Sequence, residues 1–227
     1  MIQGSGGVGG RNADDGHRFW NHIAPLYDFQ LRLELPSIVA AVDLAAPTST
    51  DRLLDAGTGT GAVLREVARR GIRPATVIGI DASKQMLNHA PSLPTAWELR
   101  VGDVRKLLFP DNSFDVVIAS YLLHLISHEQ MAAAIAEFSR VLAPRGRLVT
   151  VTPTLSPTAA SRLYALVVNV MAKAPLGVAS TLRAFDPSEA LETAGFEIRN
   201  SRVIAAGYRS LCLLAVLQEH SHGTGAE

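Results

Sequence analysis

The chain has 227 residues, of which 48% are hydrophobic and 19% charged, a composition typical of a folded globular domain. Its 21 basic residues balance its 21 acidic residues, so no excess of positive charge favours a nucleic acid as partner. The single cysteine, Cys212, excludes an internal disulfide framework and a cysteine-rich metal centre. No apolar run reaches the roughly 18 residues of a membrane span, and no signal-peptide pattern opens the chain, so a cytoplasmic location is predicted.

The two ends of the chain differ in composition from the middle. Residues 1–16 are rich in glycine and residues 220–227 are polar, so neither stretch can offset the entropy lost on ordering, and both are predicted to be flexible tails. Residues 17–219 are predicted to form a single domain, in which about 17–45 and about 159–185 are lid-like helices.

The middle of the chain alternates strands and helices. Apolar runs predict strands at Arg52–Ala56, Thr76–Ile80, Ala96–Val101, Phe114–Ala119 and Arg147–Val151. Helical periodicity predicts helices at Ala62–Arg70, Ser83–Ala90 and Glu129–Leu142, the last ended by Pro144 and Gly146. Apolar strands separated by helices indicate a parallel sheet that is covered on both faces, with right-handed crossovers.

Two late strands follow a short helix at Ser188–Ala194. They are predicted at Ile198–Ala205 and Ser210–Leu217 and form an antiparallel hairpin at the edge of the sheet. The predicted fold class is therefore α/β: a doubly wound, mostly parallel seven-stranded sheet, Rossmann-like, with an antiparallel terminal hairpin and N-terminal helices.

A glycine-rich loop follows the first predicted strand, in the sequence Asp55-Ala56-Gly57-Thr58-Gly59-Thr60-Gly61. Glycines between a strand and a helix let a ligand approach bare backbone N–H groups. Nucleotide and dinucleotide sites share this pattern, and a tight turn without a ligand also satisfies it.

Two acidic residues follow the second and third strands. The Asp81 carboxylate can accept from both hydroxyls of a ribose, and Asp103 can accept from the exocyclic amine of an adenine. Either residue alone is also compatible with a helix cap or a solvated turn. Together with the glycine loop, they place three features in order at strand carboxyl ends, which indicates one adenosine-containing ligand.

The chain resembles the class I S-adenosylmethionine-dependent methyltransferases over about Tyr27 to Leu217. The matching segments are Asp55–Gly61, Asp81–Ser83 with Met86 and Ala90, Gly102-Asp103, Phe114–Val117 running into Ser120, and Arg140–Gly146. Within this class it is most similar to the small-molecule branch of ubiquinone and menaquinone methyltransferases, through an N-terminal pattern from Phe19 to Asp28. It departs from the class at Pro144-Arg145-Gly146, where Pro-Gly-Gly is usual. Residues 151–186 differ from the quinone enzymes, so their substrate is not carried over.

The resemblance implies S-adenosylmethionine as cofactor, S-adenosylhomocysteine as product, and no metal. It implies that the glycines face the methionine part, that Asp81 holds the ribose, that Met86 packs on the adenine, and that Asp103 binds the adenine edge. The implied cofactor-binding residues are Tyr27, Asp55, Gly57, Thr58, Gly59, Asp81, Ala82, Met86, Asp103, Val104 and Ser120.

Two residues after the fourth strand are candidates for contact with the methyl acceptor. Tyr121 and His124 lie where this fold places its acceptor, and His124 is the candidate catalytic base if the acceptor must lose a proton. A hydrogen-bonded structural histidine is the alternative. His124 and His128 have helical i, i+4 spacing, but no third ligand accompanies them, so no metal site is predicted.

The acceptor is expected to be a small, largely apolar molecule rather than a nucleic acid. Stable membrane insertion is not expected, whereas a peripheral membrane contact or a homodimer through the apolar helix predicted at Ala159–Ala174 stays open. Two other functions also stay open. Gly57, Gly59 and Ala62 fit the spacing of an NAD(P)-dependent oxidoreductase, and the fold can serve as a non-catalytic ligand-binding module.

Overall fold

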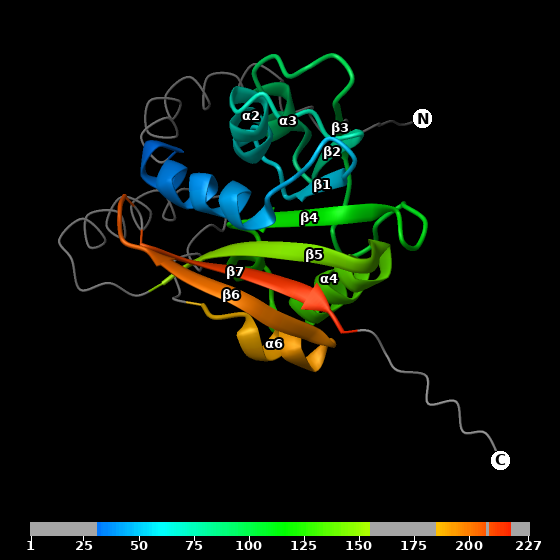
Figure 1. The fold of residues 1–227 in the computed structure, drawn as a ribbon, viewed down its shortest axis with the longest axis vertical. Helices are drawn as coiled ribbons and strands as arrows, with labels where there is room; N and C mark the ends of the chain where they lie inside the picture. Colours follow the sequence, from blue (N-terminus) through cyan, green and yellow to red (C-terminus); the bar gives the residue numbers. More distant parts are fainter. Residues whose placement is uncertain (1–30, 155–184, 208, 219–227) are drawn as a thin grey trace, which may run out of the picture.

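The computed structural model describes residues 31–154, 185–207 and 209–218. Both predicted tails, Tyr27 and the predicted Ala159–Ala174 helix lie outside the described residues, and the predicted domain limits stay predictions. A seven-stranded sheet with the order β3-β2-β1-β4-β5-β7-β6 forms the centre of the molecule (Figure 1). Within the described part of the chain, every helix is too short or too polar to cross a bilayer.

The sheet is parallel over five strands and antiparallel over its last two. The strands are β1 (Arg52–Ala56), β2 (Thr76–Asp81), β3 (Glu98–Val101), β4 (Phe114–Ser120), β5 (Leu142–Pro153), β6 (Phe196–Ile204) and β7 (Ser210–Leu217). β1, β2, β3, β4 and β5 pair in parallel, whereas β7 runs antiparallel to both β5 and β6. This confirms the predicted α/β fold, including the terminal hairpin. The chain order reverses between β1 and β4, the point where open α/β sheets bind ligands.

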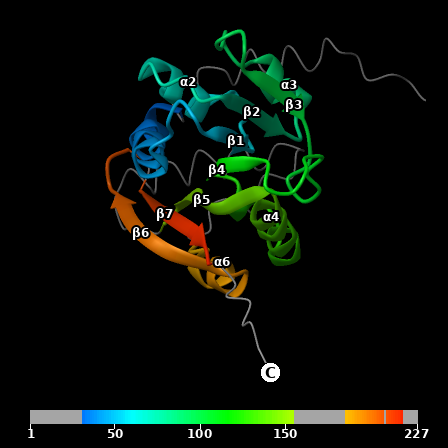
Figure 2. The ribbon, with the colours of Figure 1, turned by 45° about the vertical axis from the view of Figure 1, so that its right-hand side comes forward.

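Helices cover both faces of the sheet. They are a helix over residues 31–45, α2 (Ala62–Arg69), α3 (Lys84–Asn88), the 3-10 helix η1 (Leu123–Leu125), α4 (His128–Val141) and α6 (Ser188–Thr193). The helix over 31–45 and α2 share one buried cluster with Val116 and Val149 of the sheet. α4 and α6 share the other with Val117 and Leu148. Figure 2 shows β4 and β5 between the 31–45 helix and α4. Alternate residues of each strand therefore face opposite layers.

The end of α4 differs from the prediction that Pro144 and Gly146 terminate it. The helix ends at Val141, and Leu142 already pairs with Phe114 of β4 because its backbone is extended. The pairing then shifts register before Val116 meets Arg147. Gly146 is required in this bend, since a Cβ there would lie 2.7 Å from the carbonyl oxygen of Ala143.

Candidate functional site

The glycine loop joins the end of β1 to the start of α2. Gly57, Gly59 and Gly61 have φ values of 73°, 55° and 75°, in the left-handed region that favours glycine. The Thr58 N–H donates to the Ile80 carbonyl oxygen at 2.8 Å, which fixes the loop against β2. The loop therefore presents a nearly bare backbone at the reversal point of the sheet.

Asp81 connects this loop to the segment after β2. Its Oδ2 accepts a 2.9 Å hydrogen bond from the Gly59 N–H, and its Oδ1 accepts a 2.8 Å hydrogen bond from the Ser83 N–H. Each carboxylate oxygen keeps a further lone pair for a ligand hydroxyl. Ser83 also caps α3 by accepting from the Met86 N–H at 3.2 Å. The fold thus brings together the glycine loop, Asp81, the exposed Ala82 and the half-buried Met86.

Asp55 lies buried beneath the loop, with 1% of its surface exposed. Burial, reinforced by the charge of Asp81, raises the pKa of Asp55 to about 7. The Thr58 hydroxyl, which donates to Asp55 Oδ2 at 2.5 Å, acts in the opposite direction and lowers this pKa. Asp55 Oδ1 has no hydrogen-bond partner, and neither has the buried Oγ of Ser120 on the neighbouring strand β4. Two orphaned acceptors beside a bare backbone suit a ligand with N–H donors and positive charge. The residues present therefore fit the cofactor that the resemblance implies.

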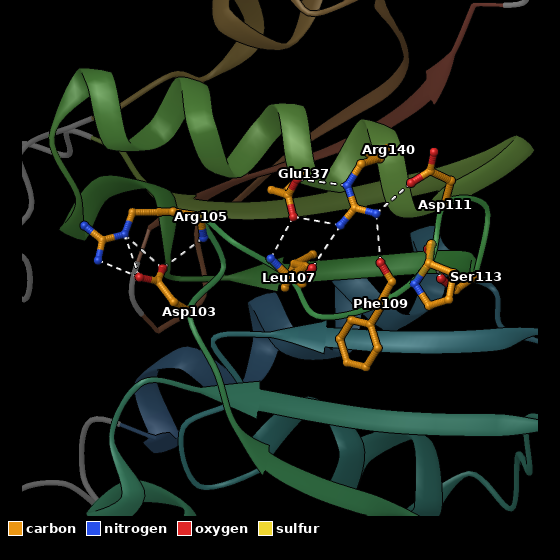
Figure 3. Close-up of polar contacts among 9 residues, drawn as sticks. Asp103, Arg105, Leu107, Phe109, Asp111, Ser113, Glu137 and Arg140 are labelled. Atoms are coloured by element: carbon orange, nitrogen blue, oxygen red, sulfur yellow. Dashed lines mark hydrogen bonds and ion pairs between the residues drawn. The ribbon is translucent and has the colours of Figure 1, made fainter.

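Asp103, predicted to bind the edge of an adenine, forms an ion pair with Arg105 that was not predicted. Arg105 contacts it through a 2.6 Å ion pair and a backbone hydrogen bond of 2.9 Å (Figure 3). The Arg105 guanidinium holds the pKa of Asp103 below its ordinary value. A ligand amine at this position must therefore share the carboxylate with Arg105. The next residue, Val104, is buried in the core.

The loop that carries Asp103 is anchored by α4. Arg140 donates to the carbonyl oxygens of Leu107 at 3.0 Å and Phe109 at 2.8 Å, while Glu137 accepts from the Leu107 N–H at 2.7 Å (Figure 3). Glu137 and Arg140 are themselves paired at 2.8 Å. Arg140, which the resemblance included without a role, therefore fixes the loop that follows Asp103 against the helix layer.

The residues predicted to contact the acceptor lie just after β4 and in η1. The rings of Tyr121 and His124 meet edge to face, with centroids 6.3 Å apart and planes at 82°. The Tyr121 hydroxyl lies 2.6 Å from Ser210 Oγ on β7. The Nδ1 atom of His124 is buried without a partner, and burial lowers the pKa of His124 to about 4. His124 is therefore a neutral imidazole near pH 7, able to accept a hydrogen bond but only weakly basic.

His124 and His128 do not share a helix. His124 lies in η1, the backbone of Ile126 is extended, and α4 begins at His128 after its Ser127 cap. The i, i+4 spacing therefore does not place the two side chains on one helix face, because the helical conformation is interrupted between them. Across residues 31–154, 185–207 and 209–218, no three potential metal-ligating side chains of His, Cys, Asp or Glu converge.

Leu122 and Ser210 belong to the site but were missed in the sequence. A Cβ on Gly57 would lie 2.9 Å from Leu122 Cδ1, so the leucine side chain packs directly against Gly57, the first glycine of the loop. An ordinary leucine and an ordinary serine carry no chemical signal, and only the fold brings them to the loop and to Tyr121.

The fold and this site define an α/β domain with a glycine loop and carboxylates at the carboxyl ends of its strands, an arrangement typical of nucleoside-binding sites. Residues 53–146 match the family model of the methyltransferase domain, which confirms the resemblance to the class I S-adenosylmethionine-dependent methyltransferases. Residues 53–146 are thus similar to a methyltransferase domain.

Proteins with a similar sequence include enzymes named demethylmenaquinone methyltransferase. The chain is 35% identical over 153 residues to the demethylmenaquinone methyltransferase of Tropheryma whipplei, covering 63% of this chain and 60% of the relative. It is 38% identical over 140 residues to that of Thermus thermophilus, covering 57% and 62%. It therefore spans about three fifths of the length of these relatives. The trans-methyltransferase CalH, solved in complex with SAH, shares the fold with a TM-score of 0.63 at 21% identity, over 85% of this chain and 59% of CalH.

Proposed function

We propose that this protein transfers a methyl group from S-adenosylmethionine to a carbon, oxygen or nitrogen atom of a small, largely apolar acceptor in the cytoplasm, without a metal. The observation that carries the proposal is the Gly59–Asp81 hydrogen bond, because it joins a bare glycine loop to a carboxylate that can bind a ribose. Asp55 and Ser120 supply orphaned acceptors for the charged methionine end.

The cofactor, when bound, supplies a methyl group on a positively charged sulfur, and the protein contributes alignment and exclusion of water. Leu122 covers the loop at Gly57 and keeps water from the methionine end. An apolar wall favours the reaction because the positive charge is lost as the methyl leaves. His124, held neutral by burial, accepts a hydrogen bond or a proton from an acceptor that carries one. The ring of Tyr121 lines the wall beside His124.

An apolar phenolic or quinol-type acceptor is the substrate class that we propose. The names of the relatives from Tropheryma whipplei and Thermus thermophilus support a quinone-type acceptor. The balance of 21 basic and 21 acidic residues gives no surface suited to a polyanion. The proposal includes a peripheral contact with a membrane surface, without insertion, through which a lipophilic acceptor of this kind is reached.

The first test is calorimetry of the full chain with S-adenosylhomocysteine and, separately, with NADH. We expect binding of S-adenosylhomocysteine alone. Binding of NADH alone would support the oxidoreductase, and binding of neither would support a different ligand-binding module.

The second test is incorporation of labelled methyl into quinols, phenols, fatty acids, amines and oligonucleotides. We expect quinols and phenols to be preferred. Preferential methylation of an oligonucleotide or of a polycationic amine would contradict the proposed acceptor class.

A further inference from the structure

Tyr121 ends β4 in a backbone conformation that is costly for an aromatic residue. Its φ is 53°, in the left-handed region that residues with a Cβ enter at a cost of about 1–2 kcal/mol. Backbone strain of this kind persists only where the surroundings hold it, and it is concentrated at functional sites. Tyr121 directly precedes Leu122, which contacts Gly57, and lies beside His124, so its strained conformation can affect the placement of both residues.

Hydrogen bonds tie Tyr121 to the strands β5 and β7. Its N–H donates to the Val151 carbonyl oxygen of β5 at 2.8 Å, and its hydroxyl lies 2.6 Å from Ser210 Oγ at the start of β7. Ser210 has no exposed surface, so this second bond is shielded from water. Burial, followed by the charge of Glu34, raises the pKa of Tyr121 far above its ordinary value, so the hydroxyl keeps its proton and does no acid–base work.

The turn at Tyr121 sets the direction of the next three residues. Leu122 lies over Gly57, with its Cδ1 atom 2.9 Å from the point that a Cβ would occupy. The Leu125 N–H donates to the Leu122 carbonyl oxygen at 3.0 Å and closes η1, which carries His124. Leu122 thus reaches the cofactor loop while His124 faces the acceptor end, and both depend on the same turn.

We infer that Tyr121 is a positioning residue: its hydrogen bond to Ser210 holds the left-handed turn that sets Leu122 on Gly57 and His124 at the acceptor end. The inference rests on the proposed methyltransferase function. In this inference the Tyr121 hydroxyl binds the sheet instead of contacting the acceptor. Leu122 then separates the cofactor loop from the acceptor end of the site.

The test removes each side of the tether. Tyr121→Phe and Ser210→Ala should each lower kcat about tenfold and weaken S-adenosylhomocysteine binding several-fold, the scale of one buried hydrogen bond. The double variant should lose less than the sum of the two single variants, because both remove the Tyr121–Ser210 bond. Ser210→Thr keeps a hydroxyl and should restore kcat. Ser201→Ala, on the exposed edge strand β6, is the matched control and should change nothing.

Two readouts separate this inference from a structural role and from the proposed function. A hydrogen bond that only stabilises the fold would lower Tm and leave kcat and the Kd for S-adenosylhomocysteine unchanged well below Tm, and that result would overturn the inference. Hydrogen exchange of the amides of residues 122–125, measured without ligand, should be faster in Tyr121→Phe. If the wild type bound no S-adenosylhomocysteine, the proposed function would fail. Hydrogen exchange would then be the test of the positioning role of Tyr121, and unchanged exchange rates in Tyr121→Phe would overturn that role.

Discussion

The backbone N–H of Gly59 donates a 2.9 Å hydrogen bond to the carboxylate of Asp81, although 22 residues separate them in the chain. One carboxylate therefore has two tasks. It fixes the glycine loop in its left-handed course, and it presents its remaining lone pairs where a ribose can bind.

Asp81→Ala should abolish tight binding of the cofactor product while the protein stays folded. Hydrogen bonds to a charged group contribute about 1.5–3 kcal/mol each, and the variant loses the ribose acceptors together with the anchor of Gly59. Calorimetry with S-adenosylhomocysteine measures the loss, and circular dichroism checks the fold. Asp186→Asn, at an exposed turn before α6, is the control. Unchanged affinity in Asp81→Ala would remove Asp81 from the site.

Gly57→Ala and Gly71→Ala form a matched pair, because both glycines have a φ of 73°. A Cβ at Gly71 meets nothing within 4 Å, whereas one at Gly57 meets Leu122 at 2.9 Å. Gly71→Ala should cost about 1–2 kcal/mol of unfolding free energy from backbone conformation alone. Gly57→Ala should cost more and should also weaken S-adenosylhomocysteine binding. Urea denaturation and calorimetry measure both, and equal effects in the two variants would show that Leu122 does not cover the loop.

Asp55 should make stability depend on pH in an unusual direction. Its pKa is about 7 in the folded protein against 3.8 ordinarily, so the native state binds more protons than the unfolded state between about pH 4 and pH 7. The free energy of unfolding contributed by this group therefore falls as the pH rises through that window and is lowest above it. Asp55→Asn should remove this contribution, gaining on the order of 4 kcal/mol at pH 8 and nothing near pH 4. Urea denaturation of both proteins at several pH values measures the difference, and a difference independent of pH would refute the assignment.

His124→Ala should lower turnover far more than cofactor affinity, since the proposed function places His124 beside the acceptor. If it acts as the base, the loss should be roughly 10²–10⁴-fold in rate. Because burial lowers the pKa of His124 to about 4, the wild-type kcat should show no step from this residue between pH 6 and pH 7. Steady-state kinetics across pH 5–8 and calorimetry with S-adenosylhomocysteine decide the matter. An equal loss of cofactor affinity would mark His124 as structural.

Much of the fold was predictable because its signals are local. The apolar run Arg52–Ala56 and the run Ser210–Leu217 match β1 and β7 residue for residue, since strands buried on both faces need continuous apolar sequence. The glycines of the loop and Asp81 were predictable for a similar reason: a strand end followed by glycine, or by an acidic residue, is visible in a few consecutive letters. The boundary between α4 and β5 was wrong because Leu142 is drawn into pairing with Phe114, a partner 28 positions away.

The sequence by itself determined the class of the fold, the glycine loop and the identity of the carboxylates after each strand. Only the tertiary structure decided how these groups are engaged. Tyr121 meets Ser210 across 89 residues, and Leu122 covers Gly57 from a different strand end. Arg105 forms an ion pair with the carboxylate of Asp103. Burial lowers the pKa of His124, so that it is neutral, and raises the pKa of Asp55, so that it is hard to ionise. Contacts, solvent exposure and pKa values depend on which groups the folded chain brings together, and no short stretch of sequence contains that information.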